Sequence, residues 1–517
     1  MNSGGRFTAR FACRQHDVRM QQTQAHSPGR DRDPFIDVIR ALCVLAVISQ
    51  HWLMPVLAYE NGHLSTGNAL ASPGWWIVTW LTQVMPMVFF AGGAANFFSF
   101  RPTKSTRVWL RSRIARLLVP VVPLAAVWLL LPHVLIGAGV PEQPVLLAGR
   151  IAGQLLWFLA VYVLVVALTP VMYQWYRRYG WRVVGVLAVC ALVVDVLRFE
   201  AGPAIGFVNA LFVWLAVHQI GFHYADGGLR VRSGRPSAGL AAVGFGLTAA
   251  AVFFGPYPAS MIGMPGAPVS NMSPPTALML SLAVGQLGLW LTLKPVITRL
   301  AGRPSAAAVL RWCGTRFMTL YLWHMPALVM TAGIAIVGLG FSTPTPGSPM
   351  WFAVAPLWIG VSGIFLMCFT GVFGRFEFRR RSGTASEMGP GRIALAAVLS
   401  AGGLLGLAAQ GFVFPGNPLA PVLWVALVLT GLLVVRERTV PEAVAGQGAR
   451  IVPVQLGVRH EDAGDGNVRG EDSRTGSAGD EDVRTGNVRD GDVRAEDSRT
   501  GNVRAEDVPV LARHGSG

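Results

Sequence analysis

The chain has 517 residues, of which 52% are hydrophobic and only 14% are charged, whereas an ordinary soluble domain is roughly a quarter charged. Apolar runs of about 18 residues or more, each long enough to cross a bilayer, recur along most of the sequence. This composition excludes a soluble globular protein. We expect an all-α polytopic membrane bundle of about 12 transmembrane helices.

The net charge of +16 combines two regions of opposite sign. Residues 1–450 hold 34 Lys and Arg against 13 acidic residues, whereas residues 451–517 hold 9 Arg against 14 acidic residues. The basic residues lie in short loops between apolar runs, as the positive-inside rule describes. We therefore attribute them to membrane topology and expect no nucleic-acid partner. The five cysteines show no metal-ligand spacing, so we expect no metal and no disulfide framework.

Apolar runs and the polar segments that flank them divide the chain into four parts. Residues 1–33 form a polar, Arg-rich arm that we expect to be disordered. A membrane domain of ten spans follows at 34–375, and residues 376–436 add two further spans. Residues 437–517 repeat short polar motifs without an aromatic residue, so they cannot offset chain entropy by burial and should form a disordered cytoplasmic tail. The candidate spans are roughly 36–58, 75–100, 114–138, 151–174, 181–198, 205–223, 238–256, 275–296, 308–337, 350–373, 391–411 and 417–435.

The loops between these spans alternate in charge. Basic residues gather in loops 101–113, 175–182, 224–237, 294–311 and 374–392, whereas loops 59–74, 255–274, 338–349 and 412–416 contain no Lys or Arg. The positive-inside rule then predicts that both termini are cytoplasmic and that the number of spans is even. We expect a multi-pass protein of the plasma membrane.

The first span carries three polar residues on one face. Arg40 and His51 are eleven positions apart, which is three helical turns plus 20°, so they share a face and are separated by roughly 16 Å of rise. Asp37 lies one turn before Arg40. Ionisable residues inside a membrane are costly and mark functional sites. Taken singly, Arg40 also fits an interfacial anchor, and His51 a hydrogen-bonded packing residue.

Carboxylates are scarce in the spans, so a base that titrates near neutral pH has to be a histidine. The candidates within spans are His51, His218 and His324, with His223 at a span edge. His324 fits a second polar group of a tunnel equally well as a packed histidine. His218 and His223 are weaker candidates, because they lie near an end that we expect to be cytoplasmic.

Several motifs together resemble the membrane acyltransferase-3 family, which includes bacterial O-antigen, exopolysaccharide and macrolide O-acyltransferases. Its first helix typically reads Asp-x-x-Arg, ten residues and His, as Asp37, Arg40 and His51 do here. The run Phe89–Asn96 is similar to a Gly-Gly variant of the second-helix motif that is associated with actinobacterial members. The remaining similarities to the family are three. They are the cluster of Arg111, Arg113 and Arg116 before Pro120, the run Leu156-Trp157-Phe158, and Tyr321-Leu322-Trp323-His324, which resembles a Tyr-x-x-His motif.

This resemblance covers about residues 34–375 and implies an acyltransferase. It implies a cytoplasmic acyl-CoA donor, most often acetyl-CoA, as co-substrate rather than bound cofactor, and a hydroxyl acceptor on a carbohydrate, glycolipid or metabolite. Guanidinium groups suit phosphate oxygens, so Arg111, Arg113 and Arg116 are candidate donor-binding residues, although positive-inside bias alone also explains Arg111. Arg40 would fix the donor at the inner mouth. His51 would be the general base or an acyl carrier, and the sequence leaves both open.

Other residues have supporting interpretations. Trp157 and Tyr321 are expected to be lining or interfacial aromatics, and Asn96 should pair across helices beside small residues that allow close approach. Gly93-Ala94 replaces the commoner Ser-Gly, so any role of that hydroxyl is absent. Two alternatives remain. One is a 12-helix transporter, although the loop 101–107 lacks the Gly and Asp of the transporter motif expected there. The other is a flippase or assembly partner without acyl-transfer activity.

Overall fold

The first transmembrane helix shows how the local sequence sets helix boundaries. In the computed structural model, which describes residues 33–229, 234–264, 269–377 and 389–436, α2 spans Pro34–Leu53. The Asp33 carboxylate accepts a hydrogen bond from Phe35 N at 3.0 Å, and Pro34 occupies the first turn, so the N-terminus is capped. The helix ends at Leu53 rather than near residue 58, because Pro55 starts a strand. The predicted disorder of the arm up to residue 32 and of the tail 437–517 lies outside the described residues.

The other elements follow in chain order. They are β1 (Pro55–Glu60), β2 (His63–Asn68), η1 (Ala69–Ala71), α3 (Trp76–Thr82), α4 (Met85–Phe100), α5 (Thr106–Leu118), α6 (Val121–Gly137), α7 (Glu142–Gln154), α8 (Leu156–Tyr179), α9 (Arg182–Ala201), η2 (Pro203–Val208), α10 (Asn209–Ala225), α11 (Arg235–Phe254), α12 (Leu278–Ala301), α13 (Pro304–Thr315), α14 (Phe317–Ala332), η3 (Gly333–Gly338, a π-helix), α15 (Pro349–Phe373), η4 (Gly374–Phe376), α16 (Pro390–Gln410) and α17 (Ala420–Val435).

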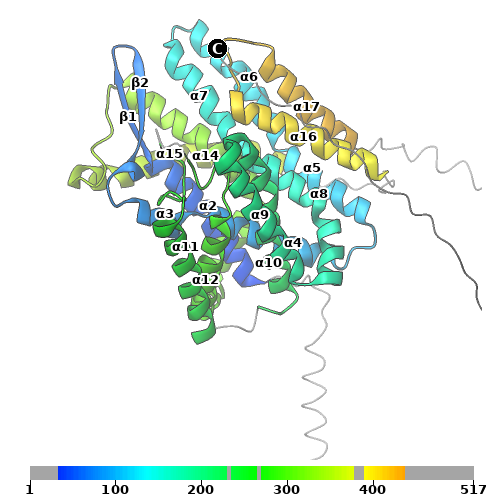
Figure 1. Ribbon diagram of the computed structural model, residues 1–517. Coiled ribbons are helices and arrows are strands. Elements are labelled where there is room, and N and C mark those ends of the chain that lie inside the picture. The colour runs from blue at the N-terminus through cyan, green and yellow to red at the C-terminus, as the bar shows by residue number, and fades with distance from the viewer. Residues whose placement is uncertain (1–32, 230–233, 265–268, 378–388, 437–517) are drawn as a thin grey trace, which may run out of the picture. The chain divides into compact units, whose positions relative to one another are not determined.

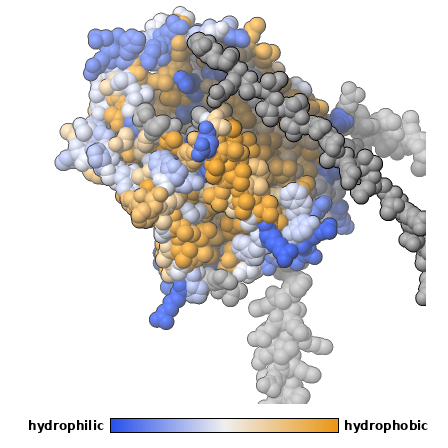
Figure 2. Space-filling model, in the orientation of Figure 1, coloured by the Kyte–Doolittle hydropathy of each residue, from blue (hydrophilic) through white to orange (hydrophobic). Residues whose placement is uncertain are grey.

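The predicted class, an all-α polytopic membrane bundle, is confirmed. Ten helical segments of the described chain are long and apolar enough to cross a membrane. Figure 2 shows hydrophobic side chains across the middle of one face, with hydrophilic ones gathered towards its upper left and lower right. Two of the twelve predicted spans do not reach that standard, because α9 carries Arg182, Asp195 and Arg198 and α17 has only 16 residues.

Two charged residues of α9, Asp195 and Arg198, are held in a polar network. The carboxylate of Asp195 accepts hydrogen bonds from Asn209 Nδ2 at 2.8 Å, Tyr257 Oη at 3.0 Å and Ala277 N at 2.7 Å. Arg198 donates to the carbonyls of Ser270 and Pro274. These bonds satisfy buried groups that would otherwise destabilise the fold. They also fix the segment between α11 and α12 against α9.

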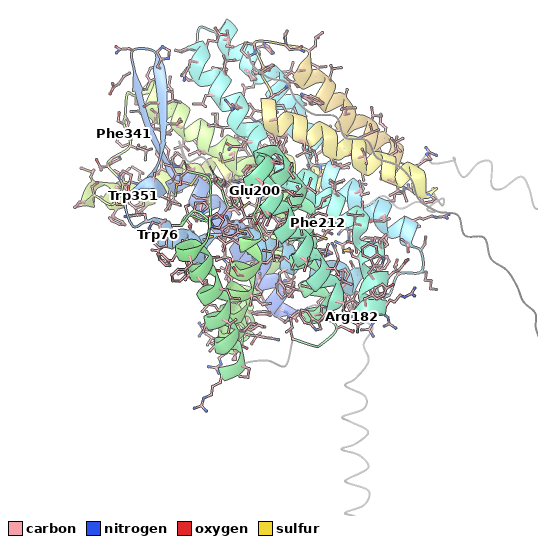
Figure 3. The ribbon with its side chains drawn as sticks, viewed as in Figure 1. Trp76, Arg182, Glu200, Phe212, Phe341 and Trp351 are labelled. Atoms are coloured by element: carbon pink, nitrogen blue, oxygen red, sulfur yellow. The ribbon has the colours of Figure 1, made fainter. Side chains whose placement is uncertain are left out.

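A β-hairpin caps one end of the helices. β1 and β2 pair antiparallel from Pro55↔Asn68 to Glu60↔His63, in a stretch where the sequence predicted the end of the first span and the loop after it. Gln143 of α7 donates to and accepts from the Leu64 backbone, and Thr343 N donates to Leu57 O at 2.9 Å. In Figure 3, Phe341 and Trp351 lie towards this end and Arg182 towards the other. We call them the hairpin end and the arginine end.

Two hydrophobic clusters form the core of the unit Met1–Pro441, to which every described residue belongs. One is built mainly from α5, α6, α8, α14, α16 and α17, and the other mainly from α4, α9, α10 and α12. α2 and α8 contribute buried residues to both clusters and therefore lie between them. Figure 1 shows α16 and α17 side by side, packed against α5, α7 and α8.

Small residues bring α4 and α10 into backbone contact. A Cβ added to Gly93 would lie 2.0 Å from the His218 carbonyl oxygen, and one added to Gly221 would lie 2.3 Å from Phe90 O. The predicted interhelical pairing of Asn96 is confirmed, since its Nδ2 lies 3.1 Å from His218 Nε2. Close approach of this kind replaces side-chain packing in membrane helix pairs.

Candidate functional site

A cavity of about 1270 Å³ lies between the two clusters. Its wall is formed by α2, the hairpin, α6, α7, α8, α14 and η3, with contributions from the start of α4, the segment before α12 and α16. Most of the lining is apolar. His51, Trp157, Tyr321 and His324 all line it, so the structure brings together four of the predicted site residues.

A histidine pair stands on the cavity wall. His51 near the end of α2 and His324 in the middle of α14 come within hydrogen-bonding distance, with 3.2 Å between His51 Nδ1 and His324 Nε2. Their ring centroids are 5.3 Å apart. His324 is completely buried, whereas His51 is partly accessible. The residue of the pair that can meet a substrate is therefore His51.

The partners of His324 fix the proton positions in the pair. Its Nδ1 lies 2.7 Å from the Tyr321 carbonyl oxygen, which can only accept, so Nδ1 carries the hydrogen. In a neutral imidazole the other nitrogen then has the lone pair, so His324 Nε2 accepts from His51 Nδ1–H. The remaining nitrogen of a neutral His51, Nε2, is left with an unshared lone pair. This is the arrangement that a general base or a nitrogen nucleophile requires.

Aromatic side chains hold the helices that carry the pair. Trp52 Nε1 donates to the His324 carbonyl oxygen at 2.9 Å, and Trp358 Nε1 of α15 donates to Trp52 O at 3.0 Å. The Tyr321 hydroxyl donates to Leu155 O at the junction of α7 and α8. These bonds link α2, α8, α14 and α15 at the depth of the two histidines, so the site is built from elements far apart in sequence.

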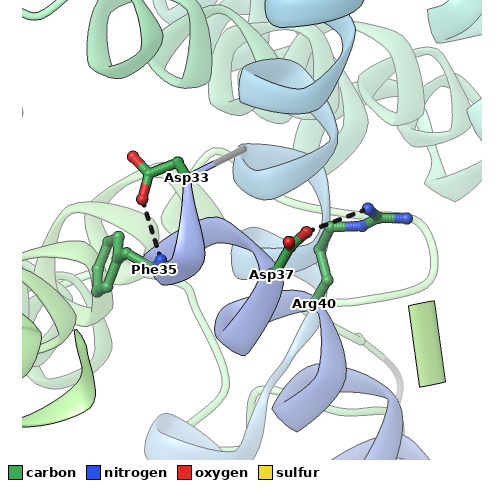
Figure 4. A network of polar contacts seen from close by, with 4 residues as sticks. All are labelled: Asp33, Phe35, Asp37 and Arg40. Atoms are coloured by element: carbon green, nitrogen blue, oxygen red, sulfur yellow. Dashed lines mark hydrogen bonds and ion pairs between the residues drawn. The ribbon is translucent and has the colours of Figure 1, made fainter. Parts of the chain in front are cut away.

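The polar residues at the start of α2 lie near the arginine end. Arg40 and Asp37 form an ion pair of 3.9 Å, one helical turn apart and about one third exposed, as Figure 4 shows. The Arg40 guanidinium also lies 5.3 Å from the ring centroid of Phe317, and Phe317 lines the cavity. Neither Asp37 nor Arg40 lines the cavity. Arg40 is thus placed beside one end of the cavity, while His51 lies within it.

The three candidate donor-binding arginines lie on α5 and do not line the cavity. Arg111 Nε donates to Val435 O at 2.9 Å, at the C-terminus of α17. Arg113 lies 5.4 Å from the ring centroid of Trp109. Arg116 is exposed and lies near the carboxylate of Glu377. Their role in donor binding stays a prediction, and Arg111 has a packing role in addition.

Glu377 had no sequence signal and emerges only from the fold. Its carboxylate accepts hydrogen bonds from Met318 N at 3.1 Å, Thr319 N at 3.0 Å and Thr319 Oγ1 at 2.8 Å, and so caps the start of α14. Burial raises its pKa above the ordinary carboxyl value, although these hydrogen bonds and Arg116 act in the opposite direction. Glu377 therefore supports the helix that carries His324.

The other histidines lie away from the cavity wall. His218 bonds to Asn96 between α4 and α10, and His223 stacks on Trp181 with ring centroids 3.7 Å apart. Gln50, Arg150 and Gln154 are among the polar residues that line the cavity and that sequence reasoning missed. No motif distinguishes them, since they share a cavity only once α2 and α7 have taken their places in the fold.

The fold and the site together define a polytopic membrane protein with a histidine pair on the wall of a large cavity. The family described as "Acyltransferase domain" matches residues 33–336, more than half of the chain. The chain therefore belongs to the membrane acyltransferase-3 family and is a membrane acyltransferase. No curated protein and no solved structure matches it. The matched region begins at the cap of α2 and ends within η3, so it contains both histidines of the pair.

Proposed function

We propose that this protein is an O-acyltransferase that moves an acyl group, acetyl by default, from cytoplasmic acyl-CoA to a hydroxyl of a carbohydrate, glycolipid or metabolite. The observation that carries the proposal is the His51–His324 pair on the cavity wall, in which His51 Nε2 keeps its lone pair. The basic loops at the arginine end support a cytoplasmic donor at that end.

The proposed reaction uses the lone pair of His51 in one of two ways. As a general base, Nε2 takes the proton of the acceptor hydroxyl while its oxygen attacks the thioester carbonyl. The C–O bond forms, the C–S bond breaks, and the proton passes to the CoA thiolate. As a nucleophile, Nε2 first forms a C–N bond to the acyl carbon while the C–S bond breaks and the CoA thiolate leaves. The acceptor oxygen then forms the C–O bond while the C–N bond breaks, and the hydroxyl proton passes to the CoA thiolate. Both routes use the same hydrogen bond from His51 Nδ1 to His324.

Positive charge on His51 develops in either route, and His324 stabilises it. The bond from His51 Nδ1–H to His324 Nε2 becomes charge-assisted as His51 gains a proton or an acyl group. His324 in turn is oriented by the Tyr321 carbonyl. His324 is therefore a positioning residue in this proposal, and His51 is the catalytic residue.

The test is acyl transfer from radiolabelled acetyl-CoA to membrane extracts by wild type and His51→Ala. Removing a general base lowers the rate by about 10²–10⁴-fold, so the variant should show almost no transfer. His63→Ala is the matched control, because His63 is an exposed histidine of the hairpin that does not line the cavity. Equal transfer by wild type and His51→Ala would overturn the proposed role of His51.

A further inference from the structure

One charged side chain stands out in the wall of the cavity. Arg150 is the only Lys, Arg, Asp or Glu among the described residues that line it. Within the part of the chain that the structure describes, Arg150 forms no ion pair with an acidic residue. The Arg150 side chain is exposed and lines the cavity, so a ligand in the cavity can reach its guanidinium group. A cavity whose single charged lining residue is a cation favours a ligand that carries the opposite charge.

Four amide side chains line the cavity, and two of them, Gln50 and Gln154, form no side-chain hydrogen bond with another described residue. Gln154 lies one turn after Arg150 on α7, and Gln50 lies beside His51 on α2. All three side chains line the cavity, and no side-chain hydrogen bond joins them to another described residue. Amides and guanidinium groups offer several donors and acceptors to a polar ligand. Arg150, Gln154 and Gln50, which we call the polar strip, stand in a wall that is mostly apolar.

Backbone packing fixes the base of Arg150. Phe412 N donates to Gly149 O at 3.1 Å, where the end of α16 meets α7. Gly411 adopts φ +79°, and a Cβ at that position would lie 2.6 Å from Arg150 Cα. The chain after α16 thus approaches α7 as closely as glycine permits. This contact holds the α7 turn that presents Arg150 to the cavity.

The polar strip leads from the hairpin end to the histidine pair. Gln143, earlier on α7, is bonded to the hairpin, and Leu155 at the end of α7 receives the Tyr321 hydroxyl. Arg150 lies between them, about 7.5 Å of helical rise from Leu155. A ligand with one group at Arg150 and another at His51 would lie along Gln154.

We propose that Arg150 binds an anionic group, a phosphate or a carboxylate, of the acceptor whose hydroxyl is acylated at His51. This inference rests on the proposed function and adds a substrate class to it. Gln154 and Gln50 bond to polar groups of the acceptor between its anion and its reacting hydroxyl. The anion belongs to the acceptor because Arg150 lies at the hairpin end, opposite the basic loops where the donor is expected to enter.

The anion can be carried by a soluble sugar or by an amphiphile, and two probe pairs separate these sources. The first pair is glucose 6-phosphate against glucose, and the second is dodecyl phosphate against dodecanol. Each probe is titrated into the full-length protein in nanodiscs of neutral lipid, and binding is followed by the shift in thermal unfolding. The titrations are repeated with Arg150→Gln, Arg150→Lys and the control Arg182→Gln, an exposed arginine that does not line the cavity.

We expect at least one phosphate probe to bind wild type about tenfold or more tightly than its neutral partner, as one charge-assisted contact provides. Arg150→Gln should abolish this preference, Arg150→Lys should keep part of it, and Arg182→Gln should leave it intact. A preference in the first pair alone assigns a soluble acceptor, and one in the second pair an amphiphilic acceptor.

Two results would overturn the inference. One is a phosphate preference that is absent from wild type or unchanged in Arg150→Gln. The other is competition between the phosphate probe and CoA together with loss of CoA binding in Arg150→Gln, because Arg150 would then serve the donor. Binding is measured without turnover, so these results are independent of the His51→Ala transfer assay. Equal unfolding temperatures of the unliganded proteins ensure that the variants are folded.

Discussion

Replacing His324 tests whether the histidine pair works through its shared hydrogen bond. His324→Leu removes the acceptor of His51 Nδ1–H and fills the buried position with an apolar side chain, whereas His324→Gln retains an oxygen that can accept the bond. A hydrogen bond to a charged group contributes about 1.5–3 kcal/mol. Since this bond gains charge only as His51 reacts, its loss should lower kcat roughly 10- to 150-fold and leave the donor KM nearly unchanged.

The assay is single-turnover acyl transfer by protein in nanodiscs with saturating radiolabelled acetyl-CoA. His324→Gln should lose less than about tenfold, and His324→Leu should fall in the calculated range. Equal rates for His324→Leu and wild type would refute the positioning role, because no other described side chain is bonded to His51. An equal loss in both variants with a lowered unfolding temperature would instead show that His324 only packs.

Three further predictions address the helices around the site. Gly93→Ala should lower stability by about 1–3 kcal/mol, because its Cβ would lie 2.0 Å from a backbone oxygen of α10. The control Gly246→Ala, which has open space around it, should not lower stability. Similar unfolding temperatures for the two variants would contradict the close packing of α4 against α10. Glu377 binds its proton more tightly in the folded protein because its pKa is raised, so wild-type stability should fall as pH rises from the ordinary carboxyl range through that raised pKa. Glu377→Gln should remove this slope in unfolding curves taken across pH, and a slope that persists would exclude Glu377 as its source. Arg113→Ala should raise the apparent KM for acetyl-CoA with unfolding unchanged, and an unaltered KM would remove Arg113 from the donor site.

Much of the architecture was predictable because hydrocarbon imposes a strong pattern on sequence. Long apolar runs predict the helices, because each membrane-spanning element must satisfy its own backbone hydrogen bonds. The motifs predict the family. The breaks were less predictable. The run at 75–100 divides into α3 and α4 around Gln83, whose amide donates to Met261 O at 2.7 Å. Such a tertiary bond leaves no periodic signal.

The site was predictable only in part, for the same reason. His51 and His324 could be selected as candidates, but their pairing depends on the packing of α2 against α14, which the sequence does not contain as a pattern. Arg150 had no signal, because a single arginine in a short loop is ordinary until its side chain is seen to line a cavity. Glu377 likewise acts on a helix that begins 60 positions earlier.

The two indole bonds at Trp52 and Trp358 have a consequence for how substrates reach the histidines. They fasten α2, α14 and α15 to one another at the level of the pair, and separating these helices would leave buried donors and acceptors unsatisfied at a cost of about 1–3 kcal/mol each. Carriers that work by alternating access rock one group of helices against another around the bound solute. Here the two indole bonds hold together the helices on either side of the reacting imidazole. Under the proposed function, donor and acceptor approach a stationary histidine pair from opposite ends. Only the acyl group then moves past the level of the two indole bonds.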